Sequence, residues 1–293
     1  MTTPSTIDPP QPVATGPVRE RDVRGGAGTR LHVREWGDPD GPPIVFVHGW
    51  SQADLCWRRQ VSGPLGATFR LITFDNRGHG RSEKPLDPAS YADGDLWAAD
   101  LDAVIEQTGL ERPVLVAWSY GALIVADYLR VHGDAAIGGI DLVGGAAVLR
   151  PPAFDHIGPA FLDAAPRACS SDLETSIPAL QRFLRACTAR PLDDETSSAA
   201  LCWSMLTPPE VRGALLAREL DATDVLARVE VPVLVTHGRR DAIILPSMAE
   251  HVLAACPAAV ASWYEDAGHM PFLEDATRFD RELAAFADAR RSP

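Results

Sequence analysis

Ala117-Trp118-Ser119-Tyr120-Gly121 is the stretch that decides the fold of this chain of 293 residues. It lies between an apolar run, Val114 to Val116, and a helix-like run, Ala122 to Arg130. A strand that passes directly into a helix through a serine needs very small residues two positions before and after it, because larger side chains collide across the turn. Gly121 meets this requirement, and Ala117 adds only a methyl group. The pentapeptide therefore predicts a nucleophile elbow, with the Ser119 hydroxyl projecting beyond the edge of a sheet.

Buried strands and amphipathic helices alternate along most of the chain. Continuous apolar runs, typical of strands buried on both faces, are followed by patterns in which apolar residues recur every three or four positions. This alternation predicts an α/β fold with a mostly parallel central sheet flanked by helices. The expected strands are 19–23, 31–36, 43–47, 70–75, 113–119, 137–143, 231–236 and 259–264, and the clearest helices end at Gly109 or span 247–255 and 276–289.

The alternation stops between residues 150 and 228. This segment is mainly helical in pattern, and it carries more large apolar side chains than a linker would. We expect an inserted helical cap at 150–228, with the core domain made of 18–149 and 229–293. Residues 1–17 are rich in Pro and Thr, do not resemble a signal peptide, and are expected to form a disordered tail.

Composition narrows the possible partners. The formal charge of −13, from 40 acidic and 27 basic residues, disfavours binding to nucleic acid or to anionic membranes. Five scattered cysteines without a C-x-x-C pair suit free thiols in a reducing compartment. Because no apolar run is long enough to span a membrane, we expect a soluble protein, with the cytoplasm as its default location. We also expect no cofactor. A homo-oligomer stays possible.

A serine nucleophile needs a base and an acid, and the sequence offers both at predicted strand ends. Asp241 follows the strand 231–236, and His269 follows the strand 259–264. Ligand sites of open α/β sheets gather at the carboxyl ends of parallel strands, and the order Ser119, Asp241, His269 is the one expected after a nucleophile elbow. We therefore predict these three residues as a catalytic triad.

Other residues could carry some of these roles. Asp266 and Asp224 are rivals of Asp241 as the acid. Since Asp266 lies on the chain leading into the loop of His269, its approach to the imidazole would be awkward. The loop after the strand 137–143 begins Gly144-Gly145 and offers no carboxylate. A metal site from His48, His79 and Asp75 is conceivable, but no dense ligand spacing supports it, so we expect these groups to hold loops.

The chain resembles the α/β-hydrolase fold family over roughly residues 19–289. The resemblance rests on the elbow, on His48-Gly49, on Asp75-Asn76-Arg77-Gly78-His79-Gly80-Arg81-Ser82 and on Gly268-His269. Within the family it is most similar to serine esterases, lactonases and cofactor-free haloperoxidases or perhydrolases. The resemblance implies an oxyanion hole made by the backbone N–H groups of Trp50 and Tyr120.

These observations predict a metal-independent serine hydrolase that cleaves a small apolar carboxylic ester or lactone through an acyl-enzyme. As residues that contact the substrate we expect Trp50 and, from the cap, Phe183, Trp203 and Met205. Alternatives on the same triad are hydrolysis of carbon–carbon bonds and perhydrolase or haloperoxidase activity. A different alternative is a receptor-like protein that binds a small molecule without turning it over.

Overall fold

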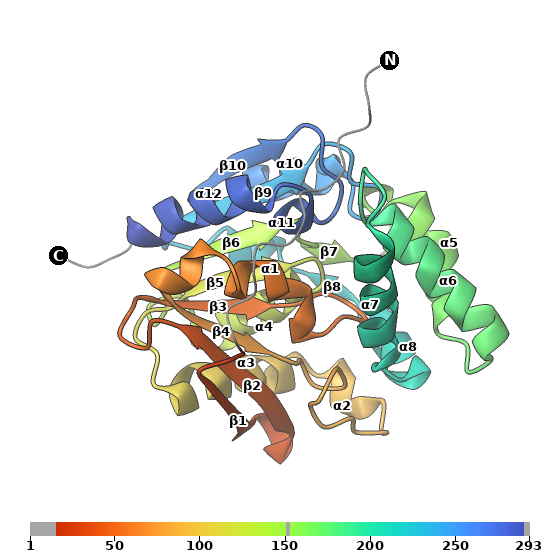
Figure 1. The fold of residues 1–293 in the computed structure, drawn as a ribbon, viewed down its shortest axis with the longest axis horizontal. Coiled ribbons are helices and arrows are strands. Elements are labelled where there is room, and N and C mark those ends of the chain that lie inside the picture. The colour runs from red at the N-terminus through yellow and green to blue at the C-terminus, as the bar shows by residue number, and fades with distance from the viewer. Residues whose placement is uncertain (1–15, 151–152, 290–293) are drawn as a thin grey trace.

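The computed structural model describes residues 16–150 and 153–289. An eight-stranded sheet forms its centre, in the order β1-β2-β4-β3-β5-β6-β9-β10 (Figure 1). β2 runs antiparallel to β1 and β4, and all pairs from β4 to β10 are parallel, so the prediction of a mostly parallel sheet is confirmed. The strands are β1 (Arg19–Arg24), β2 (Arg30–Gly37), β3 (Pro43–Val47), β4 (Arg70–Phe74), β5 (Val114–Trp118), β6 (Gly139–Val143), β9 (Val233–Gly238) and β10 (Ala259–Tyr264).

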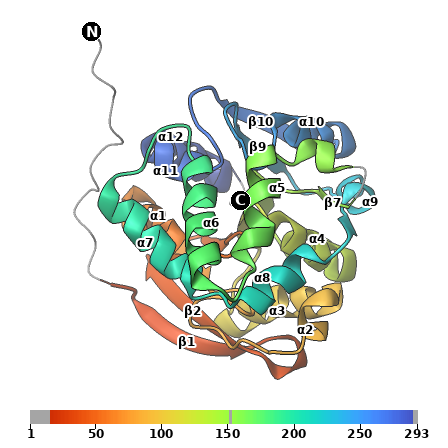
Figure 2. The ribbon, with the colours of Figure 1, turned by 90° about the vertical axis from the view of Figure 1, so that its right-hand side faces the viewer.

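Helices cover both faces of the sheet. One face is covered by a row of helices in which each contacts the next, namely α3, α4, α9 and α10. The other face is covered by three helices that pack together, α1, α11 and α12 (Figure 2). The α3 helix ends at Gly109, which has a left-handed φ of 68°, as the sequence predicts. The bounds are α1 (Arg58–Val61), α2 (Ala89–Ala92), α3 (Gly94–Thr108), α4 (Gly121–His132), α9 (Thr223–Leu226), α10 (Pro246–Ala255), α11 (Pro271–Glu274) and α12 (Ala276–Asp288).

Four further helices, which we call the cap, gather to one side of the sheet (Figure 1). They are α5 (Pro159–Ala168), α6 (Leu173–Ala186), α7 (Asp194–Met205) and α8 (Pro209–Leu216). The chain enters and leaves this region through a two-stranded antiparallel ribbon of β7 (Val148–Leu149) and β8 (Leu220–Asp221). The limits predicted for the cap and the core stay predictions, and most of the predicted tail lies outside the described residues.

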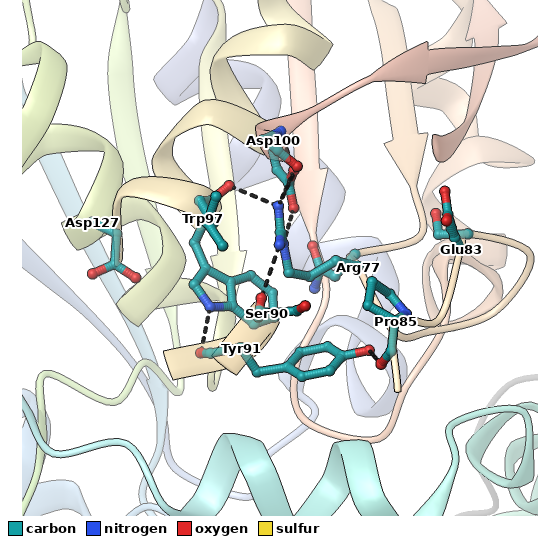
Figure 3. Close-up of polar contacts among 12 residues, drawn as sticks. Arg77, Glu83, Pro85, Ser90, Tyr91, Trp97, Asp100 and Asp127 are labelled. Atoms are coloured by element: carbon teal, nitrogen blue, oxygen red, sulfur yellow. Dashed lines mark hydrogen bonds and ion pairs between the residues drawn. The ribbon is translucent and has the colours of Figure 1, made fainter. Parts of the chain in front are cut away.

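A buried ion pair fixes the loop that follows β4. The Arg77 guanidinium contacts the Asp100 carboxylate on α3 through bonds of 2.6 Å and 2.7 Å, and both side chains are buried (Figure 3). Trp97 lies beside this pair, and its indole N–H donates to the Tyr91 carbonyl at 2.9 Å. This network joins the loop to the helical layer, as expected for a buried charge that is paired and hydrogen-bonded.

Within the described residues, none of the helices is both long and apolar enough to cross a membrane.

Candidate active site

The turn between β5 and α4 has the geometry of a nucleophile elbow. Ser119 has a φ of +58°, a conformation that is costly for a residue with a side chain and is retained where function requires it. A Cβ atom on Gly121 would lie 2.5 Å from the Val47 carbonyl oxygen, so only glycine fits there. The methyl group of Ala117 is fully buried in the sheet. The half-buried Ser119 therefore sits where β5 ends, at the carboxyl edge of the parallel strands.

Asp241 and His269 meet although they are 28 positions apart in the sequence. The imidazole Nδ1 lies 2.7 Å from Asp241 Oδ2, and both side chains are buried. The second carboxylate oxygen accepts the backbone N–H groups of Ile243 and Ile244 at 2.8 Å and 3.0 Å. The backbone N–H groups of the loop after β9 thus orient the Asp241 carboxylate. The carboxylate then orients the His269 imidazole. Nε2 of His269 is buried and has no hydrogen-bond partner among the described residues, so no hydrogen bond joins the imidazole to the Ser119 hydroxyl in this structure.

The rival acids lie elsewhere. The Asp266 side chain is 79% exposed and pairs with Arg240, whereas Asp224 is 62% exposed and pairs with Arg130 and Arg228. Neither is hydrogen-bonded to the imidazole of His269.

The loop that carries His269 is held by the cap and by α11. The His269 N–H donates to the Cys187 carbonyl at 2.8 Å, and the Trp118 indole donates to the His269 carbonyl at 2.9 Å. Glu274 accepts the Gly268 N–H at 2.6 Å on one oxygen and the Ala189 N–H at 2.8 Å on the other. Burial raises the pKa of Glu274, and these N–H groups oppose that shift. Sequence patterns gave no signal for this junction between cap and histidine loop.

The loop after His48-Gly49 is also fastened to the cap. Trp50 donates its indole N–H to the Arg212 carbonyl at 3.1 Å, and the Ser51 hydroxyl donates to the Ser204 carbonyl at 3.2 Å. Gln52 accepts the Trp203 indole N–H at 2.8 Å. The backbone expected to form one side of the oxyanion hole is therefore fastened to α7 and α8.

Tyr120, the other expected oxyanion donor, is anchored through its hydroxyl. That hydroxyl donates to the Leu215 carbonyl and accepts from Arg218, both at 3.3 Å. Arg218 is buried and forms a 2.7 Å ion pair with Asp127. Burial raises the pKa of Tyr120 to about 12, so the phenol stays protonated at neutral pH. The elbow is thereby tied to the end of α8.

A small cavity of about 20 Å³ lies beside the elbow serine. Among the four residues predicted to contact substrate, only Trp50 lines it. Phe183 packs behind the wall against Trp50, with ring centroids 5.4 Å apart. Trp203 and Met205 lie outside the lining, because Trp203 is bonded to Gln52 and the Met205 sulfur lies 3.9 Å from Arg212. The lining consists of Trp50, Ser119, Tyr120, Leu123, Ala146, Leu149, Ile157, Phe161, Leu216, Ile243 and Ile244.

His48, His79 and Asp75 serve the loops around the elbow. His48 Nε2 accepts the Asn76 N–H at 3.0 Å, and the His79 ring nitrogen Nδ1 lies 2.8 Å from the Arg77 carbonyl. Asp75 accepts backbone N–H groups of Asp54 and Arg81. Burial lowers the pKa of both imidazoles, which keeps them neutral. Over residues 16–150 and 153–289, no group of three or more His, Cys, Asp or Glu side chains is arranged to hold a metal ion.

A parallel sheet with a serine elbow and a buried acid–imidazole pair at its carboxyl edge defines the α/β-hydrolase class of proteins. Comparison with known proteins gives the same class. Residues 44–282 match the model of the alpha/beta hydrolase family, and the chain belongs to that family.

Individual relatives and solved structures are similar to the chain over most of its length. The chain is 28% identical over 260 residues to a pimeloyl-[acyl-carrier protein] methyl ester esterase of Vibrio atlanticus (strain LGP32), covering 84% of this chain and 95% of the relative. It is also 28% identical to a non-heme chloroperoxidase of Streptomyces lividans, over 74% of this chain and 80% of the relative. Among solved structures, the esterase RhEst1 from Rhodococcus sp. ECU1013 superposes with a TM-score of 0.87 at 36% identity, covering 92% of this chain and 98% of that chain.

Proposed function

We propose that the chain is a serine hydrolase that cleaves a carboxylic ester through an acyl-enzyme, with Ser119, His269 and Asp241 as its catalytic triad. The observation that carries the proposal is the buried 2.7 Å contact between the His269 imidazole and the Asp241 carboxylate, at the same sheet edge as a serine held at positive φ. Similarity to esterases over most of the chain supports the same class of reaction.

The proposed reaction follows from these contacts. Ser119 Oγ attacks the ester carbonyl while His269 Nε2 takes its proton, so that a tetrahedral oxyanion forms. The N–H groups of Trp50 and Tyr120 stabilise that oxyanion. When the alkoxide leaves, His269 returns the proton to it, and the acyl group stays on Ser119. The imidazole then activates water, which releases the carboxylic acid and restores the serine. Asp241 stabilises the imidazolium in both halves.

Hydrolysis of a p-nitrophenyl ester tests the proposal. Purified wild-type protein should release p-nitrophenol, and Ser119→Ala should lose this activity while its circular dichroism spectrum stays unchanged. Full turnover by the folded variant would refute the assignment of the nucleophile. A receptor-like protein would bind an ester without hydrolysing it in either form.

A second candidate activity is perhydrolysis. The similarity to a non-heme chloroperoxidase favours it, because hydrogen peroxide could replace water as the nucleophile that attacks the acyl-enzyme, and the product would then be a peracid. Halide oxidation assayed in the presence of acetate and hydrogen peroxide tests this activity. Lactones and carbon–carbon bonds stay alternative substrates for the same triad.

A further inference from the structure

We propose that this site selects esters whose acyl group is short, apolar and uncharged, of about two or three carbons, because that group must enter the cavity beside Ser119. The inference rests on the proposed function and adds the substrate class. It also assigns Phe161 and Leu216, two cap residues that the sequence did not single out, as determinants of acyl length.

The size of the cavity sets the limit on acyl length. Its volume of about 20 Å³ only slightly exceeds the roughly 10–15 Å³ that one water molecule requires. A methyl or ethyl group fits such a space, whereas a longer chain requires a wall residue to move. No charged side chain contributes to the lining formed by the described residues, so a carboxylate or an ammonium group on the acyl chain would be desolvated without a partner.

The position of the cavity shows which half of the ester it accepts. In the proposed reaction His269 returns a proton to the leaving alkoxide, so the alcohol half must lie next to the imidazole. His269 is not among the residues that line the cavity, whereas Ser119 and both expected oxyanion donors, Trp50 and Tyr120, are. The carbonyl carbon lies between these two sides, and the cavity therefore takes the acyl half.

Contacts behind the walls keep the cavity small. Phe161 packs edge-on against Trp50 and Phe183, with ring centroids 5.4 Å and 5.7 Å away. Ile243 and Ile244 are fixed by the bonds from their N–H groups to the Asp241 carboxylate. Since closely packed walls of this kind resist expansion, a long acyl chain has to displace cap side chains at a cost in free energy.

The wall formed by Leu216 is fixed from the other side. Leu216 is the last residue of α8, and the carbonyl of the preceding Leu215 accepts the Tyr120 hydroxyl at 3.3 Å. Arg218, two residues further on, donates to that hydroxyl and is paired with the buried Asp127. The elbow and the wall are therefore parts of one hydrogen-bonded unit, and the limit on acyl length is built into the catalytic framework.

The test is a series of p-nitrophenyl esters with acetyl, butyryl, hexanoyl and octanoyl groups, which share one leaving group. Because a single methylene that a site cannot accommodate changes kcat/KM by about tenfold or more, the wild-type protein should favour acetyl over octanoyl by about 100-fold. Phe161→Ala and Leu216→Ala should each move the preference towards hexanoyl or octanoyl. Leu162→Ala is the matched control, because this neighbour on α5 is 44% exposed and does not line the cavity.

The outcomes separate this inference from the function on which it rests. If the wild-type protein hydrolyses the octanoyl ester as fast as the acetyl ester, the inference is overturned and ester hydrolysis stands. A preference that stays the same in both folded variants also overturns the assigned wall residues. If no ester is hydrolysed and a fluorophosphonate probe does not label Ser119, the proposed function itself fails. Should the variants not fold, the wild-type series still decides the acyl preference.

Discussion

Gly144→Ala should impair catalysis while the protein stays folded. Gly144 follows β6 with a φ of +49°, and a Cβ atom there would lie 3.0 Å from His269 Nδ1 and 3.4 Å from Asp241 Oδ2. Because ordinary contact distances begin at about 3.5 Å, the imidazole would have to retreat by roughly 0.5 Å. The Nδ1–Oδ2 distance of 2.7 Å would then approach the limit of a hydrogen bond, about 3.2 Å.

A displacement of this size has a measurable cost. Since misplacing a catalytic group by about 1 Å can lower the rate about 100-fold, half that distance should lower kcat/KM for p-nitrophenyl acetate about tenfold. Left-handed backbone should also cost about 1–2 kcal/mol in the free energy of unfolding, measured by urea denaturation. Gly109→Ala is the matched control, because Gly109 has a φ of +68° with nothing within 4 Å of the added atom. It should lose similar stability but keep its kcat/KM, and equal losses of activity in both variants would refute the reasoning.

Three further predictions concern carboxyl groups. Asp241→Asn should lower kcat of the ester reaction by about 1,000- to 10,000-fold, as removal of a triad carboxylate does in serine proteases, whereas Asp266→Asn should leave it unchanged; the opposite order would reassign the acid. Glu274→Gln should destabilise the protein by about 2–4 kcal/mol in urea and lower kcat, because an NH2 group would replace one of the two carboxylate oxygens that now accept the Gly268 and Ala189 N–H groups. An unchanged kcat would show that this junction does not position His269. Burial raises the pKa of Asp280 from 3.8 to about 7, so its contribution to stability is complete below pH 3.8 and is lost as the pH rises to 7. Asp280→Asn should therefore stabilise the protein above pH 7 by up to about 4 kcal/mol and have little effect near pH 4, and a pH-independent difference in urea unfolding would contradict this.

The sheet was predictable from sequence because each strand carries its own local signal. Strands buried on both faces, such as β3 and β5, must be continuously apolar, and the sequence shows them as such. The start of β9 was expected at Val231 but lies at Val233, since apolar residues continue a strand pattern into the preceding loop. Boundaries of this kind depend on hydrogen bonding to the neighbouring strand, which composition does not encode.

Residues of the candidate site could be predicted from the sequence only where the chemistry requires a particular type of side chain. Ser119, Asp241 and His269 could be proposed from their order and their positions at strand ends, without their distances. The residues of the cavity wall could not be predicted in this way. Phe161 and Leu216 differ from other apolar cap residues only in the direction in which tertiary packing turns their side chains. The position of Ile243 and Ile244 beside the site could have been predicted in principle, because they follow Asp241 closely in a turn whose backbone N–H groups donate to its carboxylate.

The central claim is that one serine hydroxyl forms the covalent intermediate. Labelling the wild-type protein with a fluorophosphonate, followed by peptide mass spectrometry, tests it most directly. We predict a single adduct on Ser119 that is absent from Ser119→Ala and strongly slowed in Asp241→Asn. An adduct on another residue, or rapid ester hydrolysis by a wild-type protein that the probe never labels, would contradict the account.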